Sequence, residues 1–362
     1  MTRPSRAIIN LASLRHNYLT ARQLHGARAF AVVKANAYGH GAVQCARALA
    51  DVADGFAVAL MGEALELRQA GVTQPILVLE GCFDLEELRA AQSHDIWVAV
   101  HQNSQIDMIM SSTLPPQSVH VWLKVDSGMH RAGFALSAVN TAYERLRASA
   151  AVASINLMSH FARADEPEQD STAQQIEAFD AATRHLPGER SLSNSAGVLA
   201  WPQARRDWAR PGVLLYGANP LPASYIHAHP EQQLKPVMTL ESEVFAVKIL
   251  SPGEALGYGG TFVAQQPTRV GLVALGYADG YPRVVPTGTP VSIDGKPSRI
   301  IGRVSMDMLT VDLTHLPDSG MGSVVELWGN QIDINQIAQC AGTIAYELLC
   351  NVKRVQRLYI DQ

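Results

Sequence analysis

The first two thirds of the chain alternate short apolar runs, rich in β-branched residues, with longer amphipathic segments. A short buried strand followed by a helix is the repeating unit of a parallel sheet. The apolar runs predict eight strands, at residues 30–35, 55–60, 75–80, 96–101, 119–126, 155–160, 191–195 and 212–217. Helical periodicity follows most of them, for example at residues 41–50, 61–70, 84–92, 137–149 and 171–185.

Eight strand–helix units fit a closed (β/α)8 barrel of the TIM type. The rival arrangement is a doubly wound sheet, which usually has fewer strands and a glycine-rich first turn. The sequence contains no G-x-G-x-x-G segment. We therefore predict an α/β protein whose barrel domain occupies residues 1–225.

The pattern changes near residues 219–233, where prolines and polar residues predict a linker. Beyond it, turn signals separate apolar or alternating runs, which indicates a second, mainly β domain over residues 226–362. A strand-like segment at residues 6–10 could join either domain. The predicted strands lie at 237–250, 269–276, 290–293, 299–313 and 323–328, with one late helix at 334–341.

Composition restricts the function more than the fold. The 362 residues are 47% hydrophobic and 17% charged, as expected for two soluble domains. A net charge of -4 gives no electrostatic reason to expect nucleic acid or an anionic membrane as partner. Without an apolar run of membrane-spanning length or a signal-peptide pattern, we expect a cytoplasmic protein. The spacing of the cysteines and histidines predicts neither a disulfide framework nor a metal site.

The segment AVVKANAYGHG, residues 31–41, carries the clearest chemistry. Lys34 ends a fully apolar strand, and barrel enzymes place their active sites at that end of the strands. An amine kept from water there can attack an aldehyde. Tyr38 and two glycines follow in the turn, where a phosphate could bind. The alternative is a lysine whose ammonium group simply reaches solvent from the strand end.

VVKANAYGHG resembles the cofactor-lysine motif of the bacterial alanine racemases, which are fold type III pyridoxal-phosphate enzymes. Six further segments are similar to family motifs and occur in the family order: LKVDSGMHRAGF, MSHFARAD, SNSAG, ARPGVLLYG, GYADGYPR and GRVSMDM. The resemblance spans essentially the whole chain. It implies a pyridoxal 5'-phosphate cofactor and the interconversion of L-alanine and D-alanine, either for peptidoglycan or for alanine catabolism.

The resemblance implies cofactor roles for several residues of the barrel and for one late tyrosine of the second domain. Lys34 matches the lysine that holds the cofactor as a Schiff base. Arg210 matches an arginine facing the pyridine nitrogen, where a guanidinium cannot accept a proton; the alternative is a surface salt bridge. Tyr346, in a segment that departs slightly from the family pattern, matches a late tyrosine near the phosphate and the substrate entrance. The family's other phosphate ligands match Tyr38, Ser195 and the amides of Gly212 and Val213.

The resemblance also implies a two-base racemisation of the cofactor-bound amino acid. Tyr277 matches the base on the L face of Cα, and Lys34 serves the D face. A phenol ordinarily holds its proton near neutrality, so Tyr277 needs a neighbouring group that favours loss of this proton. His160 matches a histidine that contacts this tyrosine and has the arginine matched by Arg210 behind it. Taken alone, His160 is more typical of a histidine of the protein core whose hydrogen bonds are all made.

Two further barrel residues match a substrate-binding arginine of the family and the lysine that supports it. Arg131 matches the arginine that contacts the cofactor's phenolic oxygen and the substrate carboxylate, for which a guanidinium fork is suited. Lys124 matches a lysine that is carbamylated in many family members. A carbamate would change this cation into an anion and fix Arg131 in place.

Tyr277 belongs to the predicted β domain, whereas Lys34 belongs to the barrel. In the family the tyrosine comes from the neighbouring subunit, so the resemblance implies a head-to-tail homodimer with two shared sites. Met306 and Asp307 resemble residues contributed across the same interface, Met306 through a backbone amide to the substrate carboxylate. Without the resemblance, Met306 reads as an ordinary core residue of a strand.

Three other functions compete with alanine racemisation. A basic-amino-acid decarboxylase of the same architecture would be expected to use a cysteine in place of Tyr277. A non-enzymatic pyridoxal-phosphate carrier would lack the second domain. A broad-specificity racemase differs mainly in entrance residues; here Tyr277 and Tyr346 crowd the site and favour a methyl side chain, although small pockets discriminate one added group weakly.

Overall fold

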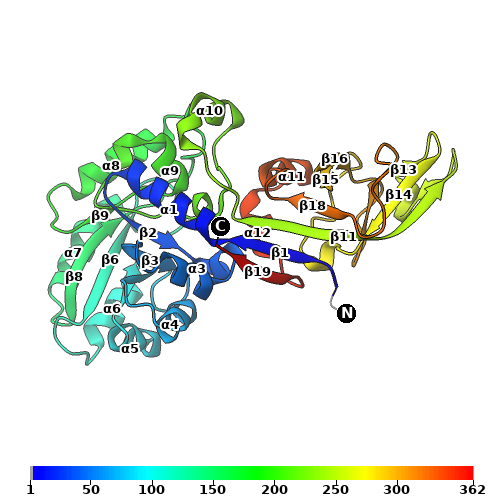
Figure 1. Ribbon diagram of the computed structural model, residues 1–362. Helices are drawn as coiled ribbons and strands as arrows, with labels where there is room; N and C mark the ends of the chain where they lie inside the picture. Colours follow the sequence, from blue (N-terminus) through cyan, green and yellow to red (C-terminus); the bar gives the residue numbers. More distant parts are fainter. Residues whose placement is uncertain (1–2, 362) are drawn as a thin grey trace.

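The computed structural model describes residues 3–361, which form a barrel domain and a mainly β domain (Figure 1). The barrel strands are β2 (Arg28–Val32), β3 (Gly55–Val58), β4 (Ile76–Val78), β5 (Ile96–Val100), β6 (Val119–Asp126), β8 (Val152–Met158), β9 (Arg190–Ser191) and β10 (Trp208–Ala209). They are parallel and ordered β5-β4-β3-β2-β10-β9-β8-β6, and pairing of β5 with β6 closes the ring. The predicted (β/α)8 barrel is confirmed.

Helices surround the barrel strands (Figure 1). The main ones are α1 (Leu11–His25), α3 (Ala42–Leu49), α4 (Met61–Gln69), α5 (Leu85–Ser93), α6 (Asn103–Ser111), α7 (Val139–Arg147) and α8 (Ser171–Thr183). The ends of α1 show why it forms where it does. The Asn10 side chain accepts the Ser13 amide hydrogen at its start, and Gly26 ends it with φ 77°.

An aromatic cluster fills the barrel interior. The Phe30 ring stacks on Trp208 with ring centroids 4.0 Å apart and meets Trp122 edge-on at 5.7 Å. These three side chains are buried. Phe30 and Trp208 come from the neighbouring strands β2 and β10, and Trp122 comes from β6 across the ring. Gly55 lacks a side chain because an added Cβ would lie 2.9 Å from the Phe30 ring. The barrel is therefore a packed core, which leaves its C-terminal mouth for a site.

The prediction for the eighth strand is wrong. Residues 212–217 do not form a strand; they include the 3-10 helix η3 (Val213–Tyr216), and the eighth strand is the shorter β10 just before them. Pro211 has no amide hydrogen to donate to a neighbouring strand, so the ladder ends there. Gly212 then turns the chain with φ -116° and ψ -92°. This turn leaves backbone amides at the barrel mouth.

The second domain is built on the long strand β11 (Met238–Leu250), which confirms the predicted mainly β character. Its sheet contains β1 (Arg6–Asn10), β15 (Pro290–Ile293), β16 (Lys296–Arg299), β18 (Val324–Trp328) and β19 (Gln356–Ile360) in the order β16-β15-β18-β11-β1-β19. The far end of β11 pairs with β14 (Thr268–Val273), which pairs with β17 (Leu309–Asp312). The N-terminal strand β1 lies between β11 and β19 and leads directly into α1 of the barrel (Figure 1).

Two late helices join the β domain to the barrel mouth. The predicted helix at 334–341 is α11 (Ile334–Ala341), but α12 (Ala345–Asn351) follows it and was not predicted. The predicted linker likewise contains a short helix, α10 (Ala223–Ala228). Helix α12 packs on the turn after Lys34 so closely that a Cβ on Gly39 would collide with the Leu349 carbonyl oxygen. No helix in residues 3–361 combines the length and hydropathy needed to cross a membrane.

Candidate active site

Lys34 leads into a left-handed turn at the C-terminal end of β2. Residues 35–38 have φ values of 52°, 54°, 53° and 50°. None of them is glycine, and left-handed backbone costs an L-residue roughly 1–2 kcal/mol. Backbone hydrogen bonds hold the turn, from Ala37 N to Val33 O at 2.8 Å and from Gly39 N to Ala35 O at 3.0 Å. Strained backbone of this kind is concentrated at functional sites.

Glu63, in the first turn of α4, stabilises this strained segment. Its Oε1 accepts the amide hydrogen of Ala35 at 2.6 Å. Its Oε2 accepts those of Ala59 and Leu60 at 2.8 and 3.1 Å. One carboxylate therefore joins the end of β3 to the residue that follows Lys34. Glu63 was not among the predicted site residues, although a glutamate in the first turn of a helix is a recognisable sequence signal.

A cavity of about 690 Å³ opens at the C-terminal end of the barrel. It contains every candidate that sequence analysis placed on the barrel, together with Tyr346 from α12. These residues are Lys34, Tyr38, Lys124, Arg131, His160, Ser195, Arg210, Gly212, Val213 and Tyr346. The lining also includes eleven residues that sequence reasoning did not select, among them Glu80, Phe83, His101, Asn194 and Cys350. These five carry no separate sequence signal, because only the closed barrel and the packing of α12 on it bring them to one mouth.

One end of the cavity gathers hydroxyl groups and backbone amides. The Ser195 hydroxyl oxygen accepts the amide hydrogen of Gly212 at 2.8 Å and that of Leu214 at 3.3 Å. A Cβ on Gly212 would lie 2.6 Å from the Tyr38 hydroxyl oxygen, so only glycine keeps this space open. The rings of Tyr38 and Tyr346 lie 6.0 Å apart. Convergent neutral donors of this kind suit an anion such as a phosphate.

Arg210 is a buried cation held by neutral oxygens. It is 4% exposed. Its guanidinium donates to the Ser191 carbonyl at 2.9 Å, to the Ser191 hydroxyl at 2.5 Å and to the Ser159 carbonyl. Burial lowers the pKa of Arg210 to about 10, which leaves it protonated near neutrality. No carboxylate of residues 3–361 lies within 4 Å of it, so the alternative of a surface salt bridge is wrong.

The cations of the cavity affect one another and His160. Burial, and after it the charges of Arg210, Arg131 and Lys34, lower the pKa of Lys124 to about 8. Burial, followed by the charge of Arg210, lowers the pKa of His160 well below its ordinary range. The imidazole is therefore neutral at physiological pH. It can accept or donate a hydrogen bond without adding a further positive charge.

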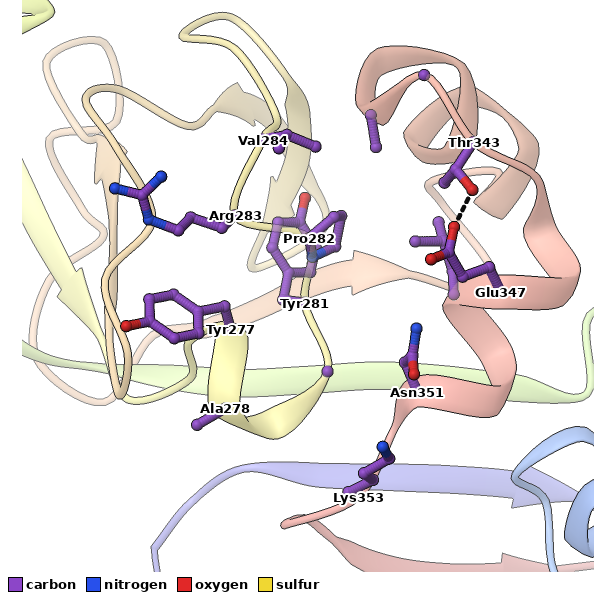
Figure 2. A pocket seen from close by; sticks show the side chains of 14 residues that line it. Tyr277, Ala278, Tyr281, Pro282, Arg283, Val284, Thr343, Glu347, Asn351 and Lys353 are labelled. Carbon is purple, nitrogen blue, oxygen red and sulfur yellow. Dashed lines mark hydrogen bonds between the residues drawn. The ribbon is translucent and has the colours of Figure 1, made fainter.

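The other three candidates of the β domain, Tyr277, Met306 and Asp307, lie apart from this cavity. Tyr277, on the short turn η6 (Tyr277–Asp279), lines a separate pocket of about 530 Å³. Across this pocket lie Thr343, in the loop between α11 and α12, and Glu347 of α12 (Figure 2). Tyr277 is 37% exposed and Met306 is 53% exposed. Neither they nor Asp307 line the cavity around Lys34. Large side chains left uncovered in this way mark a surface that another molecule can cover.

A closed barrel, a lysine at the end of a barrel strand and a following mainly β domain together define the fold type III class of enzymes. The particular family follows from two matches to family models. Residues 9–220 match the N-terminal domain of alanine racemase, and residues 237–359 match its C-terminal domain. The chain belongs to the alanine racemase family and is accordingly an isomerase.

Similarity to characterised relatives extends over the full chain. This chain is 62% identical to the alanine racemase of Azoarcus sp. (strain BH72), and the match covers 98% of each protein. It is 55% identical to a catabolic alanine racemase of Pseudomonas aeruginosa, covering 99% of each. The crystal structure of the biosynthetic alanine racemase from the same species superposes with a TM-score of 0.93 at 44% identity, covering 99% of this chain and 100% of that one. Catabolic and biosynthetic enzymes thus share this architecture.

One solved relative bears directly on the cofactor. The alanine racemase of Bartonella henselae was crystallised with covalently bound pyridoxal phosphate. It is 29% identical to this chain, with a TM-score of 0.87, and the match covers 99% of this chain and 100% of that one. The family is pyridoxal-phosphate-dependent. The lysine at the mouth of this barrel has the chemistry needed for a covalent link to an aldehyde.

Proposed function

We propose that this chain interconverts L-alanine and D-alanine with pyridoxal 5'-phosphate bound in the barrel cavity. One observation carries the proposal. An amine, several uncharged hydrogen-bond donors suited to an anion, and a buried guanidinium all line one cavity. These groups are those of Lys34, Tyr38, Ser195, Gly212 and Arg210. The cofactor, when bound, withdraws electrons from Cα of the amino acid and makes its hydrogen acidic.

The residues present fit this cofactor. Tyr38, Ser195 and the amides of Gly212 and Val213 would hold its phosphate, where the missing side chain of Gly212 leaves space. Lys34 would hold its aldehyde carbon. Arg210 cannot act as a proton acceptor, and its neutral oxygen partners leave its positive charge uncompensated at the cavity wall.

The proton transfers are assigned to two residues on opposite faces of Cα. We assign the Lys34 amine to the D face and the Tyr277 hydroxyl to the L face, so neither base has to move around the substrate. Arg131 would bind the substrate carboxylate with its guanidinium fork. Neutral His160, with Arg210 behind it, would accept the phenolic hydrogen bond and favour proton release.

Because Tyr277 lies outside the Lys34 cavity of its own chain, the site requires a second copy. We propose a head-to-tail homodimer in which the Tyr277, Met306 and Asp307 of each chain complete the cavity of the other. The exposure of Tyr277 and Met306 supports this arrangement.

Lys124 is proposed to carry a carbamate next to Arg131. Its pKa of about 8 supplies the unprotonated amine that adds to carbon dioxide, and one proton is released in the reaction. The product is an anion that would hold Arg131 in place. Electron density at Lys124 without carboxylate atoms would remove this proposal.

The substrate is tested with a panel of L-amino acids and detection of the D-product. We expect alanine to be turned over fastest and serine slowly, because Tyr277 and Tyr346 leave space for a methyl group. Comparable turnover of lysine or arginine would instead identify a broad-specificity racemase. Family membership already argues against the decarboxylase and the single-barrel carrier.

A further inference from the structure

A buried carboxylate lies two residues after the proposed base. Asp279 is 0% exposed, and its Oδ2 accepts the amide hydrogen of Gly276 at 2.9 Å, which closes the turn that contains Tyr277. The backbone of this turn also binds the neighbouring segment, with Tyr277 N donating to Ser305 O at 3.0 Å. A Cβ on Gly276 would collide with the carbonyl oxygens of Ser305 and Met306. The turn therefore fits its neighbour tightly.

Two arginines from opposite ends of the chain meet this carboxylate. Arg3 Nη1 lies 2.6 Å from Asp279 Oδ1, and Arg354 Nε lies 3.6 Å from the same oxygen. Both arginines also reach Asp307. Arg3 Nη2 donates to its backbone carbonyl at 2.5 Å, and Arg354 Nη2 to its carboxylate at 2.8 Å. The Tyr277 turn and the 306–307 segment are thus fixed to each other by one ion-pair network.

The same network is anchored in the late part of the chain. The Lys353 amide donates to the Asp279 carbonyl at 3.1 Å, and a Cβ on Gly280 would collide with the Asn351 carbonyl oxygen. Figure 2 shows Asn351 at the end of α12 and Lys353 on the coil that follows, beside and below the Tyr277 turn. Since the Tyr277 side chain itself is 37% exposed, its direction depends on how firmly this backbone is held.

We propose that Asp279 is a positioning residue for proton transfer by Tyr277, and that Arg3 and Arg354 hold its carboxylate in place. The inference rests on the proposed role of Tyr277. The residues of this ion-pair network do not line the Lys34 cavity of their own chain, so their proposed role is to hold the base and not to contact the cofactor there. Proton transfer is sensitive to small displacements of the base, so loosening this turn should slow the chemical step more than substrate binding.

The test begins with Asp279→Asn, which keeps the size and an acceptor for Gly276 but removes the charge that pairs with both arginines. We expect kcat to fall roughly 10- to 100-fold in both directions, with KM changed less than about twofold. The deuterium isotope effect at Cα should rise with L-alanine and not with D-alanine, and we expect the same asymmetry in Tyr277→Phe, which removes the proposed L-face base. Cofactor absorbance should stay at the wild-type level. Asp318→Asn, an exposed carboxylate in the same domain, is the matched control.

Arginine variants keep the proposal testable if Asp279→Asn fails to fold. The Arg3→Ala/Arg354→Ala pair should reproduce the loss of kcat and the asymmetric isotope effect, and the Arg3→Lys/Arg354→Lys pair should retain most of the activity. The positioning role is overturned if the Arg3→Ala/Arg354→Ala variant keeps the wild-type kcat. It is also overturned if the fall in kcat is fully explained by lower thermal stability and lower cofactor content. If Tyr277→Phe itself shows equal isotope effects with the two enantiomers, the proposed function fails instead.

Discussion

A buried cation and a half-buried one give the barrel cavity two different kinds of chemistry. Arg210 has a pKa of about 10 and stays charged near neutrality, although only neutral oxygens accept its hydrogen bonds. Lys124 has a pKa of about 8 and can lose its proton within the working range of an enzyme. The first is suited to a permanent electrostatic role. The second is suited to a reaction or a switch.

Lys124 should leave a pH signature in the stability of the protein. Between about pH 8 and its ordinary pKa of 10.5, the unfolded chain keeps a proton that the folded chain has lost. The unfolded state then binds more protons, so the contribution of Lys124 to folding becomes more favourable as the pH rises through this window. As the pH rises from about 8 to 10.5, we expect the free energy of unfolding of the wild type to increase relative to that of Lys124→Met.

The measurement is urea unfolding of the two proteins in buffers free of carbon dioxide, at several pH values across that window. Below about pH 8, both states of the wild type carry the proton and the difference between the two proteins should be constant. Parallel stability curves over the whole range would contradict the burial of Lys124 among the other cations.

At the scale of single elements, the left-handed turn after Lys34 is the feature that sequence patterns could not predict. Residues 35–38 include no glycine, so local preference argues against φ values near 50°. Tertiary contacts impose them, through Glu63 and the close packing of α12 against Gly39. Long apolar strands such as β6 were predictable from periodicity. The two-residue strand β10 and the seven-residue helix α12 were too short for a period to show.

Removing Glu63 should release this turn. Glu63→Ala leaves the amides of Ala35, Ala59 and Leu60 without their carboxylate, and we expect the free energy of unfolding to fall by about 1–3 kcal/mol. Cofactor should also be retained less well on dialysis, because Lys34 sits at the start of the turn. Glu66→Ala, an exposed glutamate on the same helix, is the matched control. Equal stability and cofactor content in the two variants would show that Glu63 does not hold the turn.

At the scale of the whole molecule, the two proposed bases belong to different domains and to different pockets. The sequence predicted both residues through the family resemblance, yet no periodicity indicates which chain supplies each one to a site. The β domain presents Tyr277 at its surface, held by a network that includes both ends of the chain. A dimer would turn this exposed position into a catalytic one.

Mixing two impaired variants tests the shared site. Lys34→Ala lacks one base and Tyr277→Phe lacks the other, so each homodimer should keep at most a small residual activity. In a mixed dimer one cavity carries both substitutions and the other carries none. Random reassociation should therefore restore about one quarter of wild-type activity, since half of the dimers are mixed and each has one intact site. A folded, reassociated mixture that stays at the residual level of the two parent variants would show that each chain uses its own Tyr277.

The most direct test of the account is borohydride reduction of the purified protein, followed by peptide mass analysis. We predict loss of the Schiff-base absorbance band and a reduced pyridoxyl-phosphate mass on the peptide that contains Lys34, and on no other lysine peptide. An unmodified Lys34 peptide, or a tag on Lys124 instead, would show that the strand-end lysine does not hold the cofactor.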